Sequence, residues 1–168
     1  MKNQSIIKIV NHYKGRLVGL SDEEFMRTPP MGGWSYSEVY AHIFDSSLLS
    51  LMALRKCANG EGEQGKTAFA AKAILFFGML PPGKRYKVPK RLADRAKKID
   101  FATAHQLIAD FELQLDQIIH QLATADSKSK IAHPRLGLLN AKQWLRFIEI
   151  HLTHHLKQLS RIEKNMQS

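Results

Sequence analysis

Residues 140–164, NAKQWLRFIEIHLTHHLKQLSRIEK, carry the pattern that decides the fold of this chain. Their apolar residues recur every three or four positions, which is the period of one face of an α-helix. Asn140 followed by Gln143 predicts a helix start of the capping-box kind, in which two side chains satisfy free backbone amides. The helix is expected to run to about residue 164. Its inward stripe is expected to consist of Ile148, Leu152, His155, Leu159 and Ile162.

Three further long segments and one short segment show the same helical period. A first helix is expected from about residue 3 to about residue 19. Ser35 and Glu38 predict a capping box at the start of a second helix, and Asp100 is expected to cap a third long helix, from Phe101 to Leu122. A shorter helix is expected from about residue 66 to about residue 79. The predicted inward stripe of the second helix is Val39, His42, Ile43, Ser46, Leu49 and Ala53.

The remaining segments read as connections between helices. The stretch LSDEEFMRTPPMGG at 20–33 is expected to be a loop, because its prolines and glycines cannot continue a helix. His133 precedes a proline, which favours extended backbone, and is expected to lie in a loop. No alternating run predicts a strand. The sequence therefore predicts an all-α four-helix bundle with a short extra helix, formed by residues 1–168 as a single domain.

Composition excludes several classes of protein. The single cysteine, Cys57, cannot form an intramolecular disulfide, and the chain has no thiol cluster for an iron–sulfur centre or a cysteine-based zinc site. The amino-terminal residues have no apolar stretch long enough for a signal peptide, and no apolar run is long enough to span a membrane. A cytoplasmic location is therefore expected, with no membrane partner.

The excess of positive charge is concentrated in one segment. The chain has 25 Lys and Arg against 15 Asp and Glu, a formal charge of +10, and eight of the basic side chains fall in residues 84–98 with Asp94 the one acid among them. This segment has only Tyr86 for base stacking and matches no DNA-reading motif, so a nucleic-acid partner is not expected. A solvated basic loop that attracts anionic substrates is the favoured interpretation.

Histidines on the last helix have a spacing that a metal can use. Residues 151 and 155 differ by roughly 40° around a helix axis and by about 6 Å along it, so their imidazoles point the same way. Two imidazoles so placed can share one metal ion. His155 lies on the predicted inward stripe and His151 at its edge. A buried imidazole needs a hydrogen bond or a metal to offset its desolvation, so each ring is expected to have a partner.

His42 extends this argument to the second helix, where it lies on the apolar side. Together with His151 and His155 it would give a three-histidine set with an open coordination position. Such a set suits Zn²⁺ or Ni²⁺, and imidazoles alone do not decide between them. The alternative is that each ring is a hydrogen-bonded core residue without a metal.

Two segments resemble the DinB-like family. GGWSYSEVYAHIFDSS, at 32–47, resembles the family segment W-S-x-x-E-x-x-x-H, and HPRLGLLNAKQWLRFIEIHLTHHLKQLSRI, at 133–162, resembles its closing H-P-x-x-G and H-x-x-H-H-x-x-Q motifs. The resemblance implies an up-down-down-up four-helix bundle with a metal in its core, often as a homodimer. It implies that His42, His151 and His155 are the metal ligands and that His154 is not.

The resemblance also implies a range of activities on small-molecule substrates. Relatives include metal-dependent transferases that join a low-molecular-weight thiol to an electrophile, a thiol-dependent isomerase, and proteins described only as metal-dependent hydrolases. Some relatives have Glu after the first histidine of the closing motif, where this chain has Leu152. Asp45, Glu38 or water activated by the metal could replace that base, and the catalytic residues stay open. The alternative function is a non-catalytic metal-binding or stress-related bundle.

Overall fold

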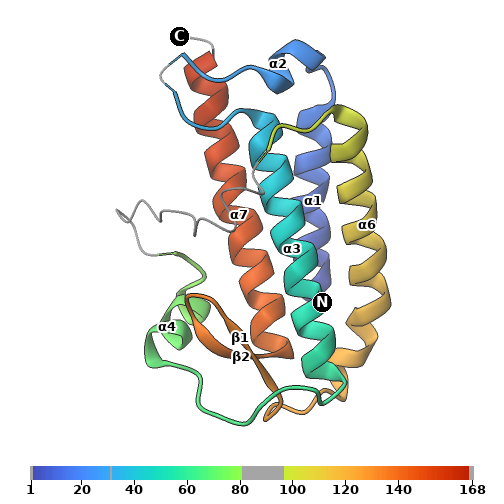
Figure 1. The fold of residues 1–168 in the computed structure, drawn as a ribbon, viewed down its shortest axis with the longest axis vertical. Helices are drawn as coiled ribbons and strands as arrows, with labels where there is room; N and C mark the ends of the chain where they lie inside the picture. The colour runs from blue at the N-terminus through green and yellow to red at the C-terminus, as the bar shows by residue number, and fades with distance from the viewer. Residues whose placement is uncertain (1, 31, 81–96, 167–168) are drawn as a thin grey trace.

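Four long helices form the body of the molecule (Figure 1). The computed structural model describes residues 2–30, 32–80 and 97–166. The chain runs up the first long helix, down the second and third, and up the fourth. These helices are α1 (Lys2–Leu17), α3 (Tyr36–Ala58), α6 (Phe101–Ile119) and α7 (Ala141–Met166). The predicted up-down-down-up four-helix bundle is confirmed.

Helix α7 contacts both α1 and α3, and α6 contacts the same two helices. Fully buried aromatic rings fill the space between them. The ring of Tyr13 on α1 meets that of Phe44 on α3 edge-on at 5.2 Å, and Phe44 meets Phe111 on α6 at 5.9 Å. The Tyr13 hydroxyl donates to the Leu152 carbonyl on α7 at 2.7 Å. One buried tyrosine therefore joins the core to the helix that carries the paired histidines.

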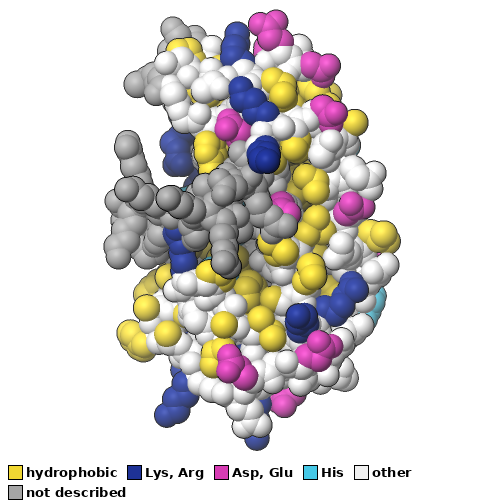
Figure 2. Space-filling model, in the orientation of Figure 1, with side chains coloured by type: hydrophobic (Ala, Val, Ile, Leu, Met, Phe, Trp, Pro, Cys, Tyr) yellow, Lys and Arg dark blue, Asp and Glu magenta, His cyan; other side chains and the backbone are white. Residues whose placement is uncertain are grey.

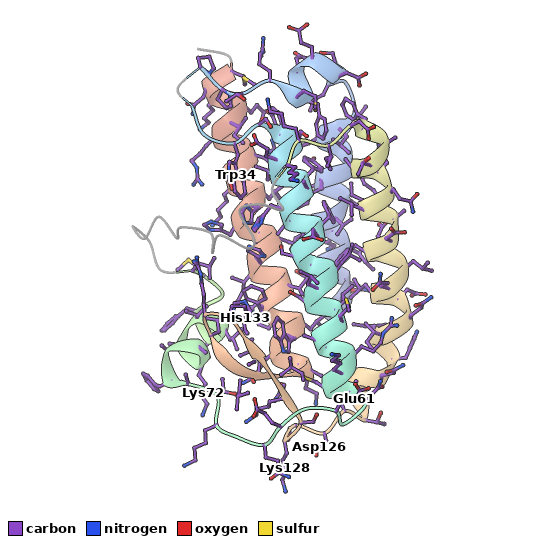
Figure 3. All side chains as sticks on the ribbon, viewed as in Figure 1. Trp34, Glu61, Lys72, Asp126, Lys128 and His133 are labelled. Carbon is purple, nitrogen blue, oxygen red and sulfur yellow. The ribbon has the colours of Figure 1, made fainter. Side chains whose placement is uncertain are left out.

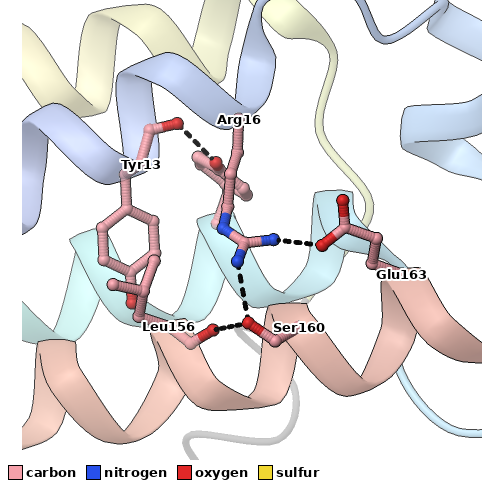
Figure 4. Close-up of polar contacts among 6 residues, drawn as sticks. Tyr13, Arg16, Leu156, Ser160 and Glu163 are labelled. Carbon is pink, nitrogen blue, oxygen red and sulfur yellow. Dashed lines mark hydrogen bonds and ion pairs between the residues drawn. The ribbon is translucent and has the colours of Figure 1, made fainter.

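A second polar contact joins α1 to α7 nearer the carboxyl end of both helices (Figure 4). The Arg16 guanidinium donates to a Glu163 carboxylate oxygen at 2.8 Å and to the Ser160 hydroxyl at 2.7 Å. The Ser160 hydroxyl in turn donates to the Leu156 carbonyl at 3.3 Å. Because these two helices are parallel neighbours, such contacts hold their register along the axis.

The predicted helix starts are confirmed at three positions. The Ser35 side chain accepts from the Glu38 amide while the Glu38 carboxylate accepts from the Ser35 amide at 2.9 Å, which is a full capping box. Asp100 caps α6 by accepting from the Thr103 amide at 2.7 Å. Asn140 and Gln143 exchange side-chain-to-backbone bonds of 3.0 Å in both directions at the start of α7.

The segment predicted as a loop at 20–33 contains a short helix, α2 (Asp22–Met26). It begins with its own capping box between Ser21 and Glu24 and buries Phe25 completely. The ring of Phe25 stacks on that of Phe101 with centroids 4.5 Å apart. A five-residue helix has too few turns to display a periodic stripe, so its capping residues were its main local signal.

The expectation that the chain has no strand is wrong. β1 (Lys130–His133) and β2 (Gly137–Asn140) form an antiparallel hairpin in which Ile131 pairs with Leu139 and His133 with Gly137. His133 therefore ends a strand and does not lie in a plain loop. Gly137 has φ = 70°, a conformation that glycine adopts without strain. A 3₁₀ helix, His120–Ala123, leads from α6 toward this hairpin.

The short extra helix, α4 (Phe69–Phe77), lies beside the hairpin at one end of α7 (Figure 1). It is shorter than the predicted span from about residue 66 to about residue 79. The Arg146 guanidinium on α7 donates to the Leu75 carbonyl at 3.1 Å and holds α4 in place. Figure 2 shows hydrophobic side chains gathered at this end of the molecule, and the exposed large ones on or beside α4 are Phe69, Phe76, Phe77 and Met79.

The inward stripe predicted for the second helix is only partly correct. Leu49 is 37% exposed, so the predicted stripe of α3 is shifted, and Ser50, Leu51 and Leu54 are buried there instead. Cys57 is buried, and burial raises the pKa of its thiol. Residues 84–96 of the basic segment lie outside the described residues. None of the described helices has the length and hydropathy needed to cross a membrane.

Candidate metal centre

Helix α7 places two imidazoles one turn apart on the side that faces α3. The Nε2 atoms of His151 and His155 lie 3.0 Å apart, and the ring centroids 4.6 Å apart. His155 is 7% exposed, and His151 is half-buried. The five residues of the predicted inward stripe are all buried, which confirms how this helix is rotated against the core. The predicted convergence of the pair follows from helix geometry alone.

Helix α3 brings His42 to the same place. Its ring centroid lies 4.9 Å from that of His155 and 5.4 Å from that of His151. One ligand atom from each of the three imidazoles lies within 4.8 Å of the others, and in the described residues this is the one such group found. The capping box at Ser35 sets the start of α3, and the packing of α3 on α7 turns His42 toward the pair.

The donor set fits a divalent transition-metal ion. Three imidazole nitrogens with no carboxylate are ligands that zinc and nickel accept, and three protein ligands leave a position for another molecule. Nitrogen-to-zinc distances are about 2.0–2.1 Å, so two nitrogens on one tetrahedral ion lie about 3.3 Å apart, and the Nε2 atoms of His151 and His155, 3.0 Å apart, are already close to that separation. The arrangement could therefore hold one metal ion, and its chemistry does not select which.

Burial keeps the three rings in the neutral form that binds metals. Burial lowers the pKa of His42 to about 4. It also lowers the pKa of His155 to about 3, with a further contribution from the neighbouring His42, and it lowers that of His151 well below the usual range. At neutral pH each ring is therefore neutral, with a free electron pair on one of its two nitrogens, so no imidazolium has to be deprotonated before a metal can bind.

Aromatic side chains flank the three histidines. The Trp34 ring meets His42 edge-on at 5.1 Å and lies parallel to His155 at 6.4 Å. The Phe147 ring stacks on His151 at 5.2 Å. Figure 3 shows Trp34 and His133 both beside α7, with His133 at the hairpin. These rings limit the directions from which water reaches the imidazoles.

The other histidines stand outside the three-histidine group. His154 is half-buried, with its ring centroid 5.2 Å from that of His155. His133 packs on Phe147 at 4.4 Å, and its Nδ1 accepts from the amides of Arg135 and Leu136 at 3.1 Å. Burial lowers the pKa of His133 to about 4. The rest are exposed: His12, His105 and His120.

Glu38 and Asp45, the two carboxylates that could replace the missing glutamate, have different surroundings. Glu38 is engaged as the N-terminal cap of α3, since its Oε2 accepts from both the amide and the hydroxyl of Ser35. Asp45 is half-buried on α3 one turn after His42. Leu152, at the position of that glutamate, is fully buried with its carbonyl bonded to Tyr13. Glu38 is therefore a poor candidate for a general base.

Sequence reasoning missed two side chains that touch the group. The Oε1 atom of Gln158 lies 2.7 Å from Nδ1 of His155. Its spacing of three residues on one helix was a usable signal, because such residues are neighbours on the helix surface. Trp34 begins the quoted family segment W-S-x-x-E-x-x-x-H, but the segment does not show that its ring contacts the histidines, because that contact depends on the fold.

Comparisons with known proteins agree with this architecture. The chain is 26% identical over 154 residues to the uncharacterized protein YuaE of Bacillus subtilis (strain 168), with 90% of each chain covered. Among solved structures it is similar to TT2238, a four-helix bundle protein, with a TM-score of 0.57, 18% identity, and 96% of this chain and 99% of that chain covered.

A second solved structure is that of YfiT from Bacillus subtilis, described as a probable metal-dependent hydrolase with an unusual four-helix bundle topology. The TM-score is 0.56 at 16% identity, with 98% of this chain and 85% of that chain covered. At these identities the two structures establish the fold alone. The family model described as DinB superfamily matches residues 11–159. The chain therefore belongs to the DinB superfamily.

Proposed function

We propose that the protein is a metal-dependent enzyme in which His42, His151 and His155 hold one divalent ion. The observation that carries the proposal is the convergence of their ligand atoms within 4.8 Å, on two helices that meet in the bundle core. The description of YfiT as a probable metal-dependent hydrolase supports the same reading. Zinc and nickel are the ions proposed, because both accept a set made only of imidazoles.

The proposed reaction is hydrolysis of a small molecule, or transfer of a low-molecular-weight thiol to a small electrophile. A bound divalent ion would lower the pKa of water or of a thiol and so supply a nucleophile at neutral pH. The residues of this chain hold the three nitrogens toward one point and keep them neutral. Trp34 and Phe147 restrict access of bulk water, which strengthens electrostatic interactions at the site.

The ligand set is tested by metal analysis of purified protein. After incubation with zinc and removal of unbound ion, we expect one ion per chain in the wild type and a large loss in His155→Ala. His154→Ala is the matched control, because this neighbouring imidazole on α7 lies outside the group, and it is expected to retain the ion. A wild type that binds no zinc or nickel, or a His155→Ala variant that binds as much as the wild type, contradicts the proposal.

Catalysis is tested separately on the loaded protein. Ester and amide hydrolysis and thiol transfer to chlorinated or epoxide electrophiles are measured in the wild type and in His42→Ala. We expect turnover in at least one assay and its loss in the variant. A protein that binds metal but shows no turnover supports the alternative of a non-catalytic metal-binding bundle, which the placement of Leu152 in the core and of Glu38 in a helix cap favours.

A further inference from the structure

The side of the His155 ring that faces away from the other histidines has a defined partner. Its Nδ1 atom lies 2.7 Å from the side-chain oxygen of Gln158. With the amide in this orientation its oxygen accepts a hydrogen bond, so Nδ1 of His155 is the donor and carries a proton. A neutral imidazole carries one ring proton, so Nε2 of His155 has its electron pair free.

This assignment fixes the contact between the paired histidines. Nε2 of His155 lies 3.0 Å from Nε2 of His151. Two free electron pairs would repel at that distance, so without a metal the Nε2 atom of His151 must carry a proton and donate it to His155. A metal held by both Nε2 atoms would need both electron pairs, so the His151 proton would have to move to its Nδ1.

We propose that Gln158 is a positioning residue that holds His155 in the Nδ1-protonated tautomer, so that His155 is ready for a metal in advance while His151 changes tautomer as the metal binds. The second half of this inference rests on the proposed metal site. The tautomer of His155 in metal-free protein does not rest on it, and it can be measured independently.

Gln158 is well placed for this role. It follows His155 by three residues on α7, so the helix backbone itself sets the spacing between the amide and the ring. The side chain is half-buried, which strengthens the hydrogen bond relative to one in water. A partner behind a metal-binding histidine fixes both the orientation and the tautomer of the ring, and its loss typically weakens metal binding about 10–100-fold.

The first test reads the tautomers directly by long-range ¹H–¹⁵N NMR of metal-free protein with labelled histidines. We expect His155 to be protonated on Nδ1 and His151 on Nε2. After addition of zinc, His155 is expected to keep its tautomer and His151 to become protonated on Nδ1. A metal-free His155 protonated on Nε2 overturns the inference, as does a His155 that changes tautomer when zinc binds.

The second test compares two glutamines on α7. Gln158→Met is expected to weaken zinc binding about 10–100-fold, measured by competition with a chromophoric chelator. Gln143→Met is the matched control, because Gln143 caps the same helix and bonds Thr67 and Asn140, away from the histidines. We expect Gln143→Met to lower stability toward urea and to leave zinc affinity unchanged. Gln158→Glu keeps an acceptor for Nδ1 and is expected to restore the His155 tautomer seen in the wild type.

The outcomes separate this inference from the proposed function. If the wild type and Gln158→Met bind zinc equally well, Gln158 is not a positioning residue and the metal site stands. If the wild type binds no metal, the proposed function fails, and the NMR measurement on metal-free protein still decides the role of Gln158. If Gln158→Met does not fold, the test uses the His155 tautomer measured by NMR in the wild type and in Gln158→Glu.

Discussion

Polar side chains in this molecule bond to specific partners, and the half-buried His133 is a clear case outside the metal centre. Its Nδ1 accepts from two successive backbone amides in the hairpin turn, at Arg135 and Leu136. A protonated imidazole has no acceptor, so protonation would break both bonds. Burial and the positive charge of Arg135 lower the pKa of His133 to about 4, which keeps the turn intact at neutral pH.

This pKa predicts how stability changes with pH. Between pH 6.5 and about 4, His133 is protonated in the unfolded chain, where its pKa is 6.5, but stays neutral in the folded protein. The contribution of His133 is therefore present above pH 6.5 and is lost as pH falls through this window, with a slope of at most about 1.4 kcal/mol per pH unit. We expect His133→Asn, whose side-chain oxygen can accept the same amides, to lose less stability on acidification than the wild type.

Urea unfolding of metal-free protein at several pH values checks this prediction. His12→Asn is the control, because it makes the same substitution at an exposed position on α1. Parallel loss of stability in His133→Asn and the wild type across the window would show that the proton is not excluded at residue 133.

The elements of the fold differ in how far local sequence specifies them. The long helices could be predicted because each has several turns of apolar spacing and a capping residue such as Ser35, Asp100 or Asn140. The hairpin could not, because its four-residue strands show no clear alternation. It is held instead by distant contacts, including the Trp144 indole donating to the Ile131 carbonyl at 3.3 Å and the bridge between Glu63 and Lys130.

The candidate site likewise contains some residues whose placement could be predicted from the sequence and others whose placement depends on the fold. The pairing of His151 and His155 follows from helix geometry, so it could be predicted from spacing. His42 gives no spacing information of its own, and it was grouped with the pair by its place on the apolar side of its helix and by the family resemblance. Trp34 could not be predicted as a neighbour of the histidines, because that contact depends on how a connecting segment crosses α3 and α7.

Two capping boxes of the same kind allow the contribution of a helix cap to the free energy of unfolding to be measured within one protein. Ser35→Ala at α3 is expected to lower the free energy of unfolding by about 1–2 kcal/mol, at the upper end for such caps. Ser35 is fully buried, and its removal leaves backbone amides without water. Ser21→Ala at α2 removes the same bonds from an exposed site and is expected to cost less. Equal losses in urea unfolding would show that burial adds nothing to the cap.

At the scale of the whole molecule, a metal bound at the three histidines would tie α3 to α7. An ion that binds only the folded state adds about 2.7 kcal/mol of stability at 100 times its Kd. For a chain of this length that is a rise in Tm of roughly 5–10 °C. We expect zinc to raise the Tm of the wild type and a chelator to reverse the rise.

His42→Ala removes the α3 ligand and is expected to abolish most of this shift, whereas His12→Ala is expected to keep it. Calorimetry with and without zinc provides the measurement. A shift of equal size in His42→Ala would mean that zinc acts elsewhere. The homodimer implied by the family resemblance stays a prediction, and light scattering of the same samples measures the mass in solution.

The topology has a consequence for the order in which the protein is made. The three histidines come from the first and last thirds of the chain, and α3 meets α7 only after α4, α6 and the hairpin have been synthesised. Because α7 follows these elements in the chain, His42 emerges from the ribosome well before its two partners, and the proposed three-histidine site cannot form early in synthesis. Binding of the proposed metal is therefore expected only after α7 has been synthesised and has packed on α3.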